Sequence, residues 1–310
     1  MPRRFHSVIT EADSGERLDM FLSKAAGVSR NRVQSMIERG LVKVDGAPVK
    51  KNHLLSRDET VEWKVPDAEP EDMTPQELPL EVLLEDDDII VIDKPAGMVM
   101  YPGPGHPENT LANALLARHP TIAGVGGKGR PGVFHRLDRD TSGLVAVALS
   151  QRAYDAMVDE LKERRMERVY LALLVGDIAA EVGSIDAPMG RSPHDRKKMA
   201  VTPAGGLRAV THFKVLERFD RDYTLAEVTL DTGRTHQIRV HFAYIGHPVA
   251  GDPDYSRGKS ARRLDLERQF LHATRLTFDH PVSGERMSFS SPLPEDLAEV
   301  LKSLRRMRGR

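Results

Sequence analysis

Ionisable side chains are crowded immediately before one apolar run of the chain. The segment 134–144, FHRLDRDTSGL, contains five of them within six residues: His135, Arg136, Asp138, Arg139 and Asp140. The run LVAVAL that overlaps its end predicts a buried strand. Charged groups next to the start of a buried strand raise the free energy of the folded state unless they pair with one another, and they are otherwise kept where they take part in a reaction. A polar turn with salt bridges between neighbours and a reactive site both fit this segment taken alone.

The charge of the protein is distributed unevenly. The 310 residues include 45 Lys or Arg and 46 Asp or Glu, for a net charge of −1. Residues 67–93 contain eleven of the acids and no Lys or Arg, which leaves 45 basic against 35 acidic residues elsewhere. The total charge therefore does not exclude a polyanionic partner such as nucleic acid.

Composition removes several classes of protein. The absence of cysteine excludes disulfides, thiolate nucleophiles and cysteine-bound zinc. The first residues contain no apolar core of a signal peptide, and no run of about 18 apolar residues occurs, so a cytoplasmic protein without membrane contact is expected. The length fits two domains.

Residues 15–65 are typical of a small separate module. Apolar residues at helical spacing predict two helices, one ended by Gly27 and one capped by Ser29 and ended by Gly40. Short strands are expected on either side of an Asp45-Gly46 turn. The second helix presents a polar face made of Arg30, Arg32, Gln34 and Arg39. This face suits a binder of phosphate backbone, although a solvated helix face is the commoner explanation of such a pattern.

The segment 66–80, PDAEPEDMTPQELPL, predicts a linker, because it contains four prolines and many acids without periodicity. We therefore expect domains at 1–65 and 81–310. In the second domain, the patterns predict a basic helix at 150–165, a strand at 169–175, a helix that begins after Thr235 and a basic C-terminal helix. The Lys- and Arg-rich segment 188–212 is either a hairpin over a polyanion or a solvated loop.

Histidines at positions 135, 236 and 241 invite a metal interpretation. No H-E-x-x-H or H-x-x-x-H spacing supports it, so histidines with protein or solvent partners are favoured and no metal site is predicted.

Two parts of the chain resemble known families. The segment GERLDMFLSKAAGVSRNRVQSMIERGLVKVDG resembles the S4 RNA-binding module, which implies RNA contacts from Arg30, Arg32, Arg39 and Lys43. The segments RPGVFHRLDRDTSGL, RVYLALLVG, TGRTHQIRVHFAYIGHPVAGDPDY and RQFLHATRLTFDHPVSGE together resemble the RluA-type pseudouridine synthases, in particular their branch acting on the large ribosomal subunit.

The resemblance implies isomerisation of uridine to pseudouridine in RNA, with 23S ribosomal RNA as the expected target and no metal or nucleotide cofactor. It implies that Asp138 is the catalytic carboxylate, that Tyr170 stacks on the uracil and that Arg239 pairs with Asp138. Further RNA contacts are implied for Arg136, Arg234 and His236. The implied fold is α+β, a mixed and largely antiparallel sheet with flanking helices behind the S4-like module, and a monomer is expected.

The chemistry agrees with these residue types. Breaking an N-glycosidic bond develops positive charge at C1′, which an ionised carboxylate stabilises or attacks, and a neighbouring arginine favours the ionised form. The sequence leaves open whether the aspartate attacks C1′ or removes the 2′ proton.

The chain departs from the family pattern at two points. Tyr101 stands where histidine is usual, and Gly206-Leu207-Arg208-Ala209 stands where Gly-Lys-x-Ala is usual, which either weakens an RNA contact or moves it to Arg208. Neither departure is expected to touch the catalytic set. Two other functions remain as alternatives: an RNA-binding or ribosome-assembly protein without catalysis, and a metal-dependent phosphoesterase that uses His135, Asp138 and His236.

Overall fold

The computed structural model describes residues 3–26, 30–50, 52–65, 73–103, 105–127, 129–195, 198–256 and 264–308. The chain divides into two compact units, residues 1–72 and 73–310, each with its own hydrophobic core. No helix in the described part of the chain is long and apolar enough to cross a membrane.

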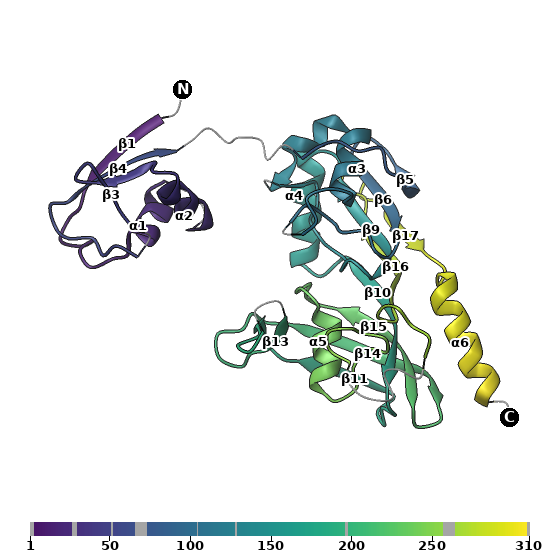
Figure 1. Cartoon of the computed structure of the whole chain (residues 1–310). Helices are drawn as coiled ribbons and strands as arrows, with labels where there is room; N and C mark the ends of the chain where they lie inside the picture. Colours follow the sequence, from purple (N-terminus) through teal and green to yellow (C-terminus); the bar gives the residue numbers. More distant parts are fainter. Residues whose placement is uncertain are drawn as a thin grey trace. The chain divides into compact units, whose positions relative to one another are not determined.

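The first unit is a four-stranded antiparallel sheet covered by two helices (Figure 1). Its elements are β1 (Arg3–Val8), α1 (Leu18–Ala25), α2 (Arg30–Glu38), β2 (Val42–Val44), β3 (Ala47–Pro48) and β4 (Thr60–Val65), with strand order β1-β4-β2-β3. Leu18 and Leu22 of α1 and Met36 of α2 are buried in its core, as the helical spacing predicts. Gly27 and Ser29, the expected cap residues, lie outside the described residues.

Two features of the first unit depend on local chemistry. Asp45 and Gly46 both have positive φ, 49° and 76°, which is the two-residue turn that joins antiparallel strands with the correct twist. Strand β1 is not anticipated from the sequence, because its residues RRFHSV lack a run of apolar side chains. It pairs with β4, where Phe5 stacks on the buried Trp63 at a ring separation of 5.8 Å.

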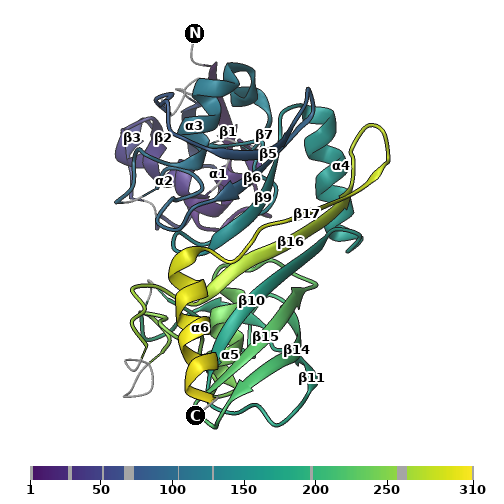
Figure 2. The same ribbon diagram turned by 90° about the vertical axis from the view of Figure 1, so that its right-hand side faces the viewer.

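The second unit is built on a nine-stranded sheet (Figure 2). Its strands are β5 (Glu81–Glu85), β6 (Ile89–Lys94), β9 (Ser142–Ala148), β10 (Glu167–Val175), β11 (Val182–Asp186), β14 (Val210–Phe219), β15 (Tyr223–Leu230), β16 (Leu271–Asp279) and β17 (Arg286–Ser290). The order is β11-β14-β15-β10-β16-β9-β6-β5, with β17 beside β16. Every pairing is antiparallel except that of β9 with β16, so the expected mixed and largely antiparallel α+β fold is confirmed.

The helices of the second unit cover both faces of this sheet. They are α3 (Leu111–Arg118), α4 (Gln151–Lys162), α5 (Gln237–Tyr244) and α6 (Glu295–Arg308). Tyr170 and Ala172 of β10 pack in the core shared with α5, whereas Leu173 packs with α6. Because successive strand residues point to opposite faces, α5 and α6 lie on opposite sides of the sheet, as both views show (Figures 1 and 2).

Two short hairpins and one terminal segment complete the second unit. The hairpins are β7 (Gly126–Gly127) with β8 (Arg130–Pro131) and β12 (Met189–Arg191) with β13 (Met199–Val201). Residues 73–80, which fall within the linker expected from the sequence, belong to this unit instead. The Asn113 side chain donates to the Thr74 carbonyl at 2.8 Å, and the backbone N–H of Gln76 donates to the Asn113 carbonyl at 3.1 Å.

Candidate active site

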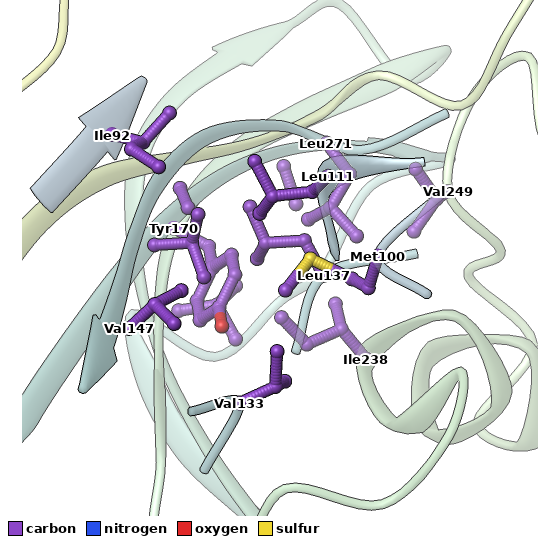
Figure 3. Packing of buried hydrophobic residues seen from close by; sticks show 14 of the residues in the cluster. Ile92, Met100, Leu111, Val133, Leu137, Val147, Tyr170, Ile238, Val249 and Leu271 are labelled. Carbon is purple, nitrogen blue, oxygen red and sulfur yellow. The ribbon is translucent and has the colours of Figure 1, made fainter. Parts of the chain in front are cut away.

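A cavity of about 490 Å³ opens where three segments of the second unit meet. The segment 133–138 before β9, the start of β10 and the turn between β15 and α5 line it. It brings together the site residues predicted in this unit, which are Arg136, Asp138, Tyr170, Arg234, His236 and Arg239. Figure 3 shows the hydrophobic core beside the cavity, in which Tyr170 packs with Val133, Leu137 and Ile238. These four residues also line the cavity.

The loop that carries Asp138 is placed by the junction of β9 and β16. All seven residues of β9 are buried, as the apolar run predicts, and the N–H of Thr141 donates to the Asp138 carbonyl at 3.1 Å. Gly143 permits the close approach of the parallel strands β9 and β16. Its φ is 109°, and a Cβ at this position would lie 2.2 Å from the Ala273 carbonyl oxygen. The loop is therefore fixed to the centre of the sheet.

Asp138 and Arg239 form an ion pair in the lining of the cavity. The carboxylate Oδ2 lies 3.3 Å from Arg239 Nη1, and the two side chains are 14% and 5% exposed. The pairing expected between these two residues is therefore present in the structure.

Arg239 has closer partners that the sequence patterns do not predict. Its Nε and Nη2 donate to Asp252 at 2.7 and 2.9 Å, and Nη2 also donates to Asp254 at 2.8 Å. The Tyr255 ring covers the guanidinium at 5.1 Å. The available signal was the spacing of two aspartates around Pro253 within GDPDY, which lies inside one of the segments that resemble the synthase family.

Electrostatics favour the charged forms of Arg239 and Asp254 but the neutral forms of the neighbouring tyrosines. Burial lowers the pKa of Arg239, but the hydrogen bonds and charge of Asp252, with the charge of Asp138, outweigh burial and leave the pKa above its ordinary value. Burial raises the pKa of Asp254, but the hydrogen bond from Arg239 and the positive charges of Arg239 and Lys198 together outweigh burial, so the net shift is downward. The Tyr255 pKa rises to about 12 because its phenol is buried, and the Tyr170 pKa rises for the same reason.

Helix α5 begins one residue later than expected. The residue that precedes its first turn is His236, in the left-handed conformation with a φ of 57°, and Thr235 is not the cap. The backbone of the turn is held by Gln237, whose Oε1 accepts from the Arg234 N–H at 3.0 Å and the Thr232 hydroxyl at 2.8 Å. His236 Nδ1 lies 2.9 Å from the Tyr255 hydroxyl. A strained residue held by several partners at a cavity is a common feature of functional sites.

Three of the five ionisable residues of the central segment, His135, Arg139 and Asp140, have partners that explain them without a reaction. Arg139 and Asp140 form an ion pair with each other at 2.8 Å, as the polar-turn interpretation predicts. His135 is buried, and its Nε2 accepts from the Ala146 N–H at 2.9 Å. Burial lowers its pKa to about 3, so the ring is neutral at physiological pH.

In the described part of the chain, no three His, Asp or Glu side chains are grouped as a metal site would require.

Arg136 lies at the rim of the cavity, where its partner is Tyr101. Its Nη1 donates to the Tyr101 hydroxyl at 2.7 Å, and the guanidinium carbons of Arg130 and Arg136 lie 4.5 and 5.4 Å from the Tyr101 ring centre. Tyr101 lines the cavity. The departure from the usual histidine therefore contacts Arg136, an expected RNA-binding residue, rather than a member of the expected catalytic set.

The RNA-binding residues expected in the first unit are described only in part. Lys43 is exposed on β2 and Arg39 is exposed at the end of α2. The side chains of Arg30 and Arg32 lie outside the described residues, so their roles remain predictions.

Comparison with known proteins identifies the family. Residues 88–244 match the family model described as RNA pseudouridylate synthase, and residues 16–61 match the S4 domain model. The chain belongs to the RNA pseudouridine synthase family. Members are isomerases that convert uridine in RNA to pseudouridine, so the family expected from the sequence is confirmed.

Relatives cover almost the whole chain. An RNA pseudouridine synthase of Bacillus subtilis, described as uncharacterized, is 45% identical over 298 residues, which is 96% of this chain and 97% of the relative. The ribosomal large subunit pseudouridine synthase D of Xanthomonas campestris is 44% identical over 310 residues, covering 96% and 92% of the two chains. The solved structure of human RNA Pseudouridylate Synthase Domain Containing 1 has a TM-score of 0.54 and 27% identity, over 73% of this chain and 95% of that one.

Proposed function

We propose that this pseudouridine synthase isomerises specific uridines of large-subunit 23S ribosomal RNA, with Asp138 as its catalytic carboxylate. One observation carries the assignment: Asp138 lines the cavity in an ion pair with Arg239, 3.3 Å away, with Tyr170 in the same wall. Relatives named ribosomal large subunit pseudouridine synthase D support the choice of RNA, since three of them are 42–44% identical to this chain.

Asp138 is suited to the bond-breaking step. When the C1′–N1 bond breaks, positive charge develops at C1′, and an ionised carboxylate stabilises this charge or forms a bond to the carbon. Arg239 remains charged next to Asp138 because Asp252 and Asp254 hold it in place. The ion pair therefore keeps the carboxylate oriented in the cavity.

Tyr170 is suited to hold the uracil. Its side chain is buried in the cavity wall, and a flat phenol offers a surface for base stacking. A cavity of about 490 Å³ is in the range that binds small ligands, and its apolar residues exclude water from the intermediate. Exclusion of water matters because the detached base has to rotate and rejoin through C5.

RNA contacts are assigned to polar and charged side chains around the cavity and to the first unit. Arg136, Arg234 and His236 line the cavity where the target nucleotide would enter. The target base has to leave its stack at a cost of a few kcal/mol, which is lowest in loops and single strands. Arg30, Arg32, Arg39 and Lys43 supply the sequence-independent contacts to phosphate that an S4 domain provides.

The test uses unmodified 23S ribosomal RNA with the purified full chain and with Asp138→Asn. Pseudouridine is mapped by carbodiimide labelling and primer extension, with a parallel reaction in EDTA. We expect site-specific stops with the native protein only, equal with and without EDTA. Tyr170→Phe should retain part of the activity because the ring is preserved, whereas Tyr170→Ala should abolish it.

Other outcomes would favour the alternatives. Stops that persist with Asp138→Asn would remove the catalytic assignment, and stops lost in EDTA would favour a metal-dependent enzyme. If stops occurred on transfer RNA but not on 23S RNA or its precursor particle, the substrate would be transfer RNA and not 23S RNA. Binding without stops on any RNA would favour a binding or assembly role. Cytoplasmic location and a monomeric state form part of this proposal, and sedimentation of the purified protein tests the second.

A further inference from the structure

Arg168 is a buried cation in the cavity that the proposed mechanism does not use. It lies on β10, is 8% exposed and lines the same cavity as Asp138 and Tyr170. Its Nη2 donates to the Leu230 carbonyl at 3.2 Å, and its buried Nε has no hydrogen-bond partner among the described residues. Within the described residues, no carboxylate lies within 4.0 Å of its guanidinium nitrogens. Such a group is rare, because a buried charge is normally paired.

Nearby residues do not supply the missing charge. Among the described residues, Asp231 is the one carboxylate that acts on Arg168 through its charge, but its own oxygens are engaged by Arg164 at 3.1 Å and His212 at 3.0 Å. In the described part of the chain, the other ionisable groups that interact with Arg168 through its charge are His135 and Tyr170, and burial favours the neutral form of both. The unliganded protein therefore contains an excess positive charge beside Tyr170.

The adjoining turn leaves room for this guanidinium. A Cβ on Gly233 would lie 2.9 Å from Arg168 Nη1, closer than real side chains approach. Gly233 does not have a positive φ, so the constraint at this position is space and not backbone conformation. A glycine in the turn thus lets the Arg168 head group border the cavity.

An anion that reaches Arg168 has to pass the opening of the cavity and enter its buried part. Phosphate groups of RNA meet exposed cations first, and Arg136, Arg164 and Arg234 are exposed at the opening. Arg168 is buried beside Tyr170, where the proposed function places the base. We propose that Arg168 contacts the uracil and stabilises the negative charge that the base acquires when it leaves C1′, an inference that rests on the proposed active site.

The charge balance of the reaction gives this cation a role. When the C1′–N1 bond breaks, its electron pair passes to N1 and spreads to the two uracil oxygens, while Asp138 compensates C1′. The base rotates, C5 forms the new bond to C1′ with an electron pair of the ring, the C5 proton leaves and N1 takes a proton. A fixed guanidinium favours the anionic base over the neutral nucleoside, as preorganised donors do for other developing anions.

The test compares two leaving groups in single-turnover reactions with saturating enzyme. 23S RNA is transcribed with uridine or with 5-fluorouridine, whose base is the better leaving group because fluorine withdraws electrons from the ring. Loss of the original nucleoside at the target site is followed by mass spectrometry. We expect Arg168→Met to slow uridine cleavage by about 100-fold, the effect of removing one preorganised donor. The loss should shrink to about tenfold with 5-fluorouridine, and Arg168→Lys should restore part of the rate.

Controls separate this role from others. Arg164→Met, which removes an exposed cation of the same cavity, should affect both RNAs by the same factor. An equal loss on both RNAs for Arg168→Met, with weaker RNA binding, would assign Arg168 to phosphate and overturn the inference. A native rate for Arg168→Met, or a lowered melting temperature that accounts for the loss, would also overturn it. A wild-type protein inactive on every RNA would instead refute the proposed function.

Discussion

Arg239 has two partners whose surroundings differ. Asp252 is fully buried and bonds to the guanidinium through two nitrogens, whereas the Asp254 side chain is 38% exposed and accepts one bond. Removing one member of a buried ion pair leaves the other charge uncompensated, whereas an exposed partner is largely replaced by water. Asp252 and Asp254 therefore contribute differently to the free energy of unfolding, although they are separated by a single residue.

We expect Asp252→Asn to lower the free energy of unfolding by about 3–5 kcal/mol, the usual effect of breaking a buried pair. Asp254→Asn, the matched control, should cost about 1 kcal/mol or less because its site is half exposed. Scanning calorimetry of the full chain measures both. Equal losses for the two variants would contradict the view that Asp252 anchors Arg239.

His135 should make the stability of the second unit depend on pH. Its pKa is about 3 in the folded protein because of burial, against about 6.5 in the unfolded chain, so the unfolded state binds a proton first as the pH falls. The free energy of unfolding is therefore not reduced by this group well above pH 6.5, and it decreases as the pH falls from 6.5 toward 3. Between pH 7 and pH 5 the loss from this group amounts to about 2 kcal/mol.

Urea unfolding followed by circular dichroism at the two pH values measures this loss. His135→Gln retains an acceptor for the Ala146 N–H but cannot be protonated, so its own pH dependence should be smaller by about 2 kcal/mol. Buried His241 and His272 contribute in the same direction in both proteins, since burial also lowers their pKa. Identical pH dependence in variant and native protein would contradict the prediction.

At the scale of elements, helices and strands with strong patterns were predictable. Helix α4 follows its expected cap, Ser150, whose hydroxyl accepts from the Ala153 N–H at 3.2 Å, and the apolar run after Gly143 forms β9. The sheet order was not predictable from periodicity, because β9 pairs with a strand more than a hundred residues later. For the same reason, the anchoring of Arg239 by Asp252 required the fold, since it depends on a turn that no pattern places beside α5.

Helix α6 is connected to the loop that carries Asp138 through one residue. Arg268 precedes β16 and donates to Asp296 in the first turn of α6 at 2.6 and 2.9 Å. Its Nη1 donates to the Asp140 carbonyl at 3.1 Å, and the neighbouring Gln269 donates to the Thr141 hydroxyl at 3.2 Å. The start of α6 therefore helps to hold the loop that carries Asp138.

We expect Arg268→Met to lower the single-turnover rate by about 10- to 100-fold at saturating RNA, because small displacements of a catalytic group are costly. RNA affinity should not change, since Arg268 does not line the cavity of Asp138. Glu299→Gln, which changes an exposed ion pair of the same helix, is the control and should react at the native rate. Weaker binding with an unchanged rate would assign Arg268 to RNA contact instead.

At the scale of the molecule, the two units have separate cores, and each sheet is complete in itself. We expect residues 73–310 to fold alone, with a cooperative thermal transition, and to retain the isomerase step at high RNA concentration. Binding of RNA should weaken, because the S4 domain is removed. Filter binding and calorimetry measure the two effects, and a fragment without cooperative unfolding would contradict separate folding.

Trp63 also makes the first unit spectroscopically distinct. It is the single tryptophan of the chain, it is buried in the core of the first unit, and Phe5 stacks on it. Excitation at the red edge of the absorption band, which tyrosines do not share, therefore gives emission from the first unit alone. A titration with RNA that shifts this emission reports on the S4 domain without any label, while turnover reports on the cavity.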